Sequence, residues 1–121
     1  MKVYVVDDDE SVRRAIVRLL KSAGIAAQSF ASAEEFLEAD VPTGDACMVA
    51  DVRLTGMSGL DLKEEMDKRG NAIPVIFITG HDAEGVRQQA KTLGAAAYFR
   101  KPVDAQALLD AISFIGHGMP T

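Results

Sequence analysis

The sequence predicts an α/β fold in which five parallel strands form a doubly wound sheet, in the order 2-1-3-4-5, with helices on both faces. Five short apolar runs alternate with segments of helical periodicity, which is typical of repeated strand–helix units. Some runs, such as residues 75–78, are apolar at every position, as strands covered on both faces are. The 121 residues suffice for one compact domain, which we expect over residues 1–116, with residues 117–121 as a tail or linker stub.

The five predicted strands are short and rich in apolar or β-branched residues. They cover residues 2–6, 25–30, 46–50, 74–78 and 96–99. Parallel strands need a crossover connection long enough for a helix, and such connections are right-handed. The segments between the strands are therefore expected to be helices that cover the sheet.

The first predicted helix has one apolar face, because its apolar residues recur at three- and four-residue spacings. Asp9 is its expected N-cap, and Gly24 marks its expected end. The later helices carry similar signals at their ends. These are a possible capping box of Ser32 with Glu35, N-terminal signals at Ser58, Asp82 and Asp104, and helix ends at Gly70, Gly94 and about Ile115.

Composition disfavours several classes of protein. With 18 acidic and 13 basic residues, the net charge is -5, so we expect no nucleic acid contact by this domain itself. No apolar run approaches the ~20 residues of a membrane span, and no signal peptide is visible, so a cytoplasmic protein without membrane contact is expected. Cys47, the single cysteine, lies in an apolar run and is expected to be a small buried hydrophobic residue.

Polar side chains follow four of the five predicted strands, where functional groups gather in open α/β sheets. Asp7 and Asp8 follow the first strand, and Asp51 follows the third. Thr79 and Lys101 follow the fourth and fifth. In the expected order, the first and third strands are neighbours, so the three aspartates should lie close together. Such a cluster raises a carboxylate pKa or binds a cation, and Mg²⁺ suits it because this ion leaves room for phosphoryl oxygens.

This arrangement resembles the response regulator receiver family of two-component systems, which has the CheY-like, flavodoxin-like fold. The resemblance covers about residues 2–115 and rests on Val6-Asp7-Asp8, Asp51, Thr79-Gly80 and Lys101-Pro102. It implies that Asp51 is the phosphoacceptor. It also implies that Mg²⁺ is bound by Asp8, Asp51 and the backbone carbonyl of Arg53. Asp7 would be an outer or water-mediated ligand.

The resemblance further implies a switch driven by phosphorylation. Thr79 and Lys101 would contact the phosphoryl group, and Tyr98 on the fifth strand would rotate into the space that Thr79 vacates. The face that changes would be formed by the fourth helix, the fifth strand and the fifth helix. A sensor histidine kinase would be the donor. The protein would then be a phosphoacceptor that assists its own phosphorylation and dephosphorylation, and not an enzyme in the usual sense.

Within the family, the segments after Asp51 and Thr79 are similar to receivers that control LuxR-type helix-turn-helix outputs in nitrogen-fixation-type regulators. Regulation of transcription through such an output is therefore expected. The chain would be either a free-standing receiver or the N-terminal part of a longer regulator. A phosphorylation-dependent homodimer is a further hypothesis.

Three other functions were compared with the receiver. A haloacid-dehalogenase-type phosphatase would have an aspartate where Arg53 stands. A flavodoxin-type FMN module needs a phosphate-binding loop after the first strand, where the acidic run 7–10 would repel phosphate. A receiver-like docking or dimerisation module that is never phosphorylated stays open as the alternative.

Details of the site also stay open in the sequence. The acidic pair could be Asp8 and Asp9 instead of Asp7 and Asp8, although Asp9 is the better helix cap. Thr55 stands where the family commonly has proline, and we expect this to free the loop without touching the reacting groups. The Lys101–Pro102 peptide is at a position that is commonly cis in the family.

Overall fold

The sheet has the strand order predicted from the sequence. The structure is a computed structural model that describes residues 1–80 and 84–116, in which five parallel strands are ordered β2-β1-β3-β4-β5. The strands are β1 (Lys2–Val6), β2 (Ala26–Phe30), β3 (Ala46–Asp51), β4 (Val75–Thr79) and β5 (Ala97–Arg100). Every boundary lies within one residue of its predicted position, which confirms the doubly wound α/β class.

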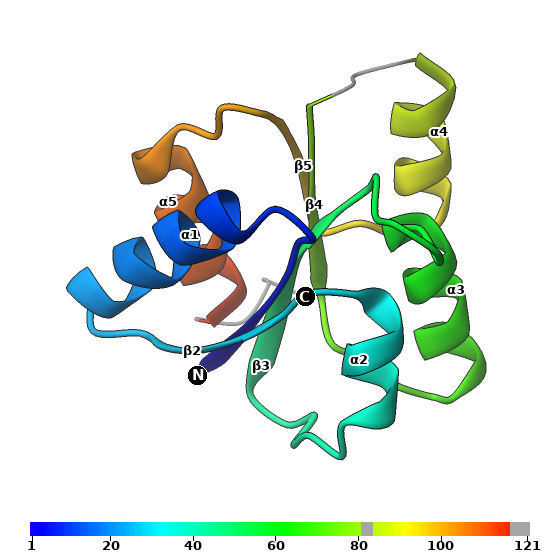
Figure 1. Cartoon of the computed structure of the whole chain (residues 1–121), viewed down its shortest axis with the longest axis horizontal. Coiled ribbons are helices and arrows are strands. Elements are labelled where there is room, and N and C mark those ends of the chain that lie inside the picture. The colour runs from blue at the N-terminus through cyan, green and yellow to red at the C-terminus, as the bar shows by residue number, and fades with distance from the viewer. Residues whose placement is uncertain (81–83, 117–121) are drawn as a thin grey trace.

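The helices cover the two faces of the sheet unequally (Figure 1). They are α1 (Glu10–Ser22), α2 (Ala33–Glu38), α3 (Gly59–Lys68), α4 (Glu84–Thr92) and α5 (Ala105–Gly116). Helices α1 and α5 lie on one face, and α2, α3 and α4 lie on the other. This three-layer arrangement leaves the carboxyl ends of the strands to be covered by loops alone.

Each face of the sheet has its own hydrophobic core, because successive side chains on a strand point to opposite faces. Phe77 on β4 packs with Leu62 and Met66 of α3 on one side. Its neighbour Ile78 packs with Leu20 of α1 and residues of α5 on the other. Every residue of β3 and β4 is buried, in agreement with the uninterrupted apolar runs of the sequence. Cys47 is among the fully buried residues of β3, as expected.

The caps of the helices follow the sequence signals with one exception. The Asp9 carboxylate accepts hydrogen bonds from the backbone N–H groups of Ser11 and Val12, so Asp9 is the N-cap of α1. The exception is the capping box predicted for α2, where Ser32 accepts from the Glu35 N–H but the return bond is absent from the described contacts. A complete capping box forms instead at α3, between Ser58 and its N3 residue, Asp61.

Some predictions fall on segments outside the described residues. These predictions are the N-terminal signal of the fourth helix at Asp82 and the tail or linker stub at 117–121. Within the part of the chain that is described, no helix combines the length and apolar character needed to cross a membrane.

Candidate functional site at the carboxyl edge of the sheet

Three aspartates meet where β1 and β3 end. Val6 pairs with Ala50 in the parallel register, so Asp7 and Asp51, the next residues on each strand, lie side by side. One carboxylate oxygen from each of Asp7, Asp8 and Asp51 lies within 4.8 Å of the others. Asp7 and Asp51 are buried, whereas Asp8 is exposed. The cluster predicted from the strand ends is therefore present, and it has one side open to solvent.

Lys101 joins this cluster from the far edge of the sheet. Its Nζ atom lies 2.8 Å from Oδ2 of Asp51 and 3.0 Å from Oδ2 of Asp7. The Lys101 backbone N–H donates to the Thr79 carbonyl oxygen at 2.8 Å, which holds the segment after β5 against the end of β4. The Lys101–Pro102 peptide, whose isomer the sequence left open, is cis. A cation is thus held between two buried carboxylates.

The charges in this cluster are not fully balanced by hydrogen bonds. Oδ1 of Asp7 accepts from the Asp9 backbone N–H at 2.9 Å. Oδ2 is buried and accepts no hydrogen bond among the described residues, although Lys101 Nζ is close enough for an ion pair. Burial raises the pKa of Asp7 despite the opposing effects of the Asp9 hydrogen bond and the Lys101 ammonium group 3.0 Å away. Two buried carboxylates and one exposed carboxylate that share a single lysine keep excess negative charge, which fits a divalent cation, or a water bound to one, beside the cluster.

The electrostatics of Lys101 favour its charged form. Burial lowers the pKa of Lys101, but hydrogen bonds and charge interactions with Asp51 and Asp7 outweigh this effect and raise the pKa overall. Lys101 therefore stays protonated and can stabilise negative charge beside Asp51.

The loop between β3 and α3 contacts two of the three aspartates. The backbone N–H of Arg53 donates to Oδ1 of Asp51 at 3.0 Å. Both the backbone N–H and the hydroxyl of Thr55 donate to Oδ2 of Asp8, at 3.0 and 2.9 Å. The expectation that Thr55 frees the loop without touching the reacting groups is therefore wrong. A proline could not make either bond, because it has neither an N–H nor a hydroxyl group.

Other contacts hold the same loop, and the sequence analysis missed the residues that make them. The Met57 N–H donates to Oε2 of Glu34 on α2 at 3.1 Å. Gly59, the first residue of α3, packs directly on β3, since a Cβ atom there would lie 2.3 Å from the Asp51 carbonyl oxygen. A glycine at the first position of a helix was a visible signal of close packing. No sequence signal pointed to Glu34.

The two proposed switch residues lie farther along the edge. Thr79 is fully buried at the end of β4, where its carbonyl oxygen accepts a hydrogen bond from the Lys101 backbone N–H. Tyr98 is half-buried on β5 and pairs with Phe77, and the guanidinium carbon of Arg87 lies 5.5 Å from the centre of its ring. Thr79 and Tyr98 both contribute to the face of the sheet that α4 covers, as the switch hypothesis requires.

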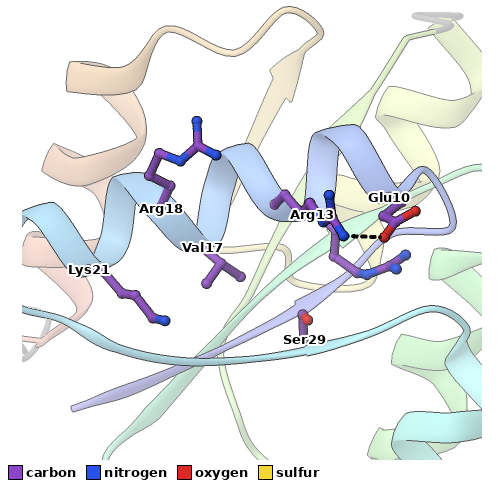
Figure 2. Close-up of a pocket in the computed structure, with 7 residues that line it drawn as sticks. Glu10, Arg13, Val17, Arg18, Lys21 and Ser29 are labelled. Atoms are coloured by element: carbon purple, nitrogen blue, oxygen red, sulfur yellow. Dashed lines mark ion pairs between the residues drawn. The ribbon is translucent and has the colours of Figure 1, made fainter.

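A second polar surface lies on α1 (Figure 2), and its Arg13 donates to the backbone carbonyl oxygen of Asp7 at 2.7 Å. An open depression of about 510 Å³ separates α1 from Ser29 on β2. Its cationic side chains are Arg13, Arg14, Arg18 and Lys21. Figure 2 shows Arg18 and Lys21 extending in different directions from the helix, and Arg14 pairs with Glu10 at 2.8 Å. These cations do not converge on a common point.

Comparison with known proteins agrees with this geometry. The response regulator receiver domain profile matches residues 3–113. The chain is 42% identical over 112 residues to the transcriptional regulatory protein FixJ of Azorhizobium caulinodans, which covers 93% of this chain and 53% of FixJ. It is 43% identical over 110 residues to nodulation protein W of Bradyrhizobium diazoefficiens, which covers 91% of this chain and 48% of that protein. The chain spans about half the length of the curated relatives it matches.

Solved structures have the same fold. A receiver protein from Pseudoalteromonas atlantica superposes with a TM-score of 0.90 at 28% identity, covering 99% of this chain and 100% of that chain. FixJ-N superposes with a TM-score of 0.87 at 31% identity, covering 99% of this chain and 96% of that chain. The response regulator StyR gives 0.86 at 43% identity, covering 93% of this chain and 57% of that chain.

Proposed function

Because the chain belongs to the response regulator receiver family of two-component systems, we propose that Asp51 accepts a phosphoryl group from a sensor histidine kinase in the presence of Mg²⁺. The observation that carries this proposal is the convergence of Asp7, Asp8, Asp51 and Lys101 at one edge of the sheet. Members of this family are phosphoacceptors and not classical enzymes. We propose in addition that this domain assists both its own phosphorylation and its own dephosphorylation.

The chain's own residues can perform the transfer. A carboxylate oxygen of Asp51 would attack the phosphorus atom of the donor, the new O–P bond forming as the P–N bond of the phosphohistidine breaks. Lys101, 2.8 Å from Asp51, would stabilise negative charge on the phosphoryl oxygens. The buried Thr79 hydroxyl, at the end of the neighbouring strand, would donate to the same group. The backbone N–H of Arg53 holds the acceptor carboxylate in position.

The metal part of the proposal rests on the donor set. Asp8, Asp51 and the Arg53 carbonyl would bind Mg²⁺, and Asp7 would take part from the outer shell. Bound Mg²⁺ would supply charge neutralisation at the phosphoryl oxygens. The three carboxylates, whose oxygens lie within 4.8 Å of one another while one lysine contacts two of them, support a cation in this cluster.

A cleft beside the acceptor supports docking of the kinase there. It is lined mainly by apolar residues of α1 and of the turn between β5 and α5, and Lys101 is part of its wall. Lys101 also contacts Asp51, so a partner bound in this cleft would lie next to the acceptor. The partner's phosphohistidine has to approach Asp51 closely, and this surface allows it.

We propose that the output is transmitted through the α4–β5–α5 face. Tyr98 lies on this face, and Phe114 of α5 is 53% exposed, which suits a protein contact such as a phosphorylation-dependent homodimer. The relatives include transcriptional regulators about twice as long as this chain. From that likeness we infer that the protein controls transcription in the cytoplasm. Because this domain is acidic, an output segment or a partner would contact the DNA in its place.

Incubation with acetyl phosphate tests the proposal. Intact mass is measured for the wild type and for Asp51→Asn, with Mg²⁺ and with EDTA. We expect a phosphoryl adduct on the wild type with Mg²⁺ only. If no condition gives an adduct, the domain is instead a docking module that is never phosphorylated. If Asp51→Asn is modified as fast as the wild type, the acceptor is another residue.

A further inference from the structure

The contact between Thr55 and Asp8 links two loops that are far apart in the sequence. Asp8 belongs to the turn between β1 and α1, and Thr55 lies 47 residues later in the loop between β3 and α3. Thr55 donates twice to a single atom, Oδ2 of Asp8, from its backbone N–H and from its hydroxyl group. Hydrogen bonds to a charged acceptor are stronger than those between neutral groups. This pair therefore restrains a carboxylate that solvent exposure would otherwise leave free to rotate.

The restraint is selective for one oxygen of the carboxylate. Both bonds use Oδ2, so Oδ1 takes no part in the contact. Mg²⁺ takes one or two carboxylates and demands near-ideal octahedral geometry, which rewards a ligand whose orientation is already fixed. Carboxylates that bind metals are commonly held in this way by hydrogen bonds from an outer shell of residues.

We propose that Thr55 is a positioning residue that orients Asp8 for the divalent cation. The proposal rests on the function proposed above and concerns the affinity of that same site. Two observations carry it. Thr55 is bonded to Asp8 while one carboxylate oxygen from each of the three aspartates lies within 4.8 Å of the others. In addition, the loop that carries Thr55 is also bonded to Asp51, through the backbone N–H of Arg53 at 3.0 Å.

The opposite effect is a competing possibility. If Thr55 held Asp8 away from the cation, the two bonds would have to break before metal binding, and their removal would strengthen binding. The geometry argues against this, because the aspartate cluster is already assembled while Thr55 is bound to Asp8. The two possibilities predict changes of opposite sign in the affinity for Mg²⁺.

Thr55 would also make the loop part of the metal site. The same loop carries Arg53, whose N–H bonds Asp51 and whose carbonyl is the proposed third ligand. A proline at position 55 would stiffen the loop by fixing its own backbone. Threonine instead restrains the loop by attaching it to Asp8, a proposed metal ligand. The position of the loop and the orientation of Asp8 are therefore coupled in this chain.

Titration calorimetry of Mg²⁺ into the unphosphorylated protein tests this inference. Thr55→Val removes the hydroxyl but keeps the backbone N–H and the side-chain shape, and Thr55→Ser keeps both donors. Loss of an outer-shell partner typically weakens metal binding by about 10- to 100-fold, so with one donor left we expect about tenfold weaker binding for Thr55→Val. Thr55→Ser should bind as the wild type does. Thr92→Val, at the end of α4, is the matched control and should have no effect.

Each result has a defined meaning. Equal or tighter Mg²⁺ binding by Thr55→Val would overturn the positioning role of Thr55 while leaving the proposed function intact. A wild type that binds no Mg²⁺ would overturn the proposed metal site, and this inference with it. A second measurement needs no variant, since Mg²⁺ should shift the ¹⁵N amide resonance of Thr55 in the wild type. An unchanged Thr55 resonance under saturating Mg²⁺ would also contradict the coupling.

Discussion

The carboxyl edge of the sheet and the basic face of α1 both gather charged side chains, but they do so in different ways. At the carboxyl edge, Asp7, Asp51 and Lys101 lie at the ends of three separate strands, and Lys101 Nζ lies within 3.0 Å of a carboxylate oxygen of each aspartate, largely out of water. On α1, the side chains of Arg14 and Glu10 are 73% and 64% exposed, and they come from adjacent turns of one helix. The first arrangement requires the whole fold, and the second requires only a helix.

The difference teaches which kind of charged surface indicates chemistry. The depression beside α1 holds about 510 Å³, yet Arg14, Arg18 and Lys21 are exposed, and Arg18 and Lys21 extend in different directions (Figure 2). The carboxyl edge brings carboxylates together in a largely buried place, which is unfavourable unless cations balance their charge. Convergence of buried charges, and not the size of a hollow, identifies the functional site here.

The largest expected effect concerns Lys101. Lys101→Met removes the only described cation that touches both Asp7 and Asp51. Loss of one preorganised donor to developing charge typically costs on the order of 100-fold in rate, and we expect such a fall in the initial rate of phosphorylation by acetyl phosphate. Lys21→Met on α1 should leave the rate unchanged. Equal losses in the two variants would mean that overall charge, and not convergence, controls the reaction.

The next effect concerns the packing beneath the acceptor. In Gly59→Ala the new Cβ would lie 2.3 Å from the Asp51 carbonyl oxygen, so the backbone has to move. We expect a loss of about 2 kcal/mol in the free energy of unfolding, the usual cost of overpacking. Gly85→Ala in α4 meets nothing within 4 Å and should be neutral or stabilising by up to about 1 kcal/mol. Urea denaturation measures both, and a neutral Gly59→Ala would show that the contact relaxes without cost.

A smaller effect should follow from metal binding. A ligand at about ten times its dissociation constant stabilises the folded state by roughly 1.4 kcal/mol, or about 5 °C in a domain of this size. We expect Mg²⁺ to raise the melting temperature of the wild type by this amount and EDTA to reverse it. Asp8→Asn should abolish the shift, while Glu10→Gln on α1 should retain it. A shift that survives Asp8→Asn would place the cation elsewhere.

The smallest effect is predicted for the exposed ion pair on α1. Arg14→Ala removes the partner of Glu10, but exposed pairs of this kind contribute about 0.3–0.5 kcal/mol. The free energy of unfolding, measured by thermal unfolding, should therefore fall by no more than about 0.5 kcal/mol. The phosphorylation rate should not change. A loss above 1 kcal/mol would show that the basic face has a structural role that its exposure hides.

Much of the fold could be predicted because its signals are local. Strands buried on both faces are apolar throughout, as at residues 75–78, and helix ends carry side chains such as Asp9 that bond the first N–H groups. The capping box at α3 was missed because its N3 residue is Asp61, whereas the usual signal is glutamate or glutamine. At α2 the usual residue, Glu35, is present, but the return bond is absent from the described contacts, so the local signal gives the helix start and not every bond of its cap.

The site was predicted in part, for a physical reason. Residues at strand ends are brought together by the strand order, so Asp7, Asp51 and Lys101 could be placed from the sequence. The contact of Thr55 with Asp8 joins two loops, and the conformation of a loop has no periodic signal. Gly59 was likewise missed, because a glycine at the start of a helix indicates close packing without showing which part of the chain it packs on.

Chemical trapping of the phosphorylated residue tests the central claim most directly. Borohydride reduces an aspartyl phosphate to homoserine, so the protein is treated with acetyl phosphate and Mg²⁺, reduced, digested and sequenced by mass spectrometry. The account predicts homoserine at position 51 and at no other aspartate, and none when EDTA replaces Mg²⁺. Homoserine at position 7 or 8, or a product that forms equally well in EDTA, would contradict the assignment of Asp51 as the metal-assisted acceptor.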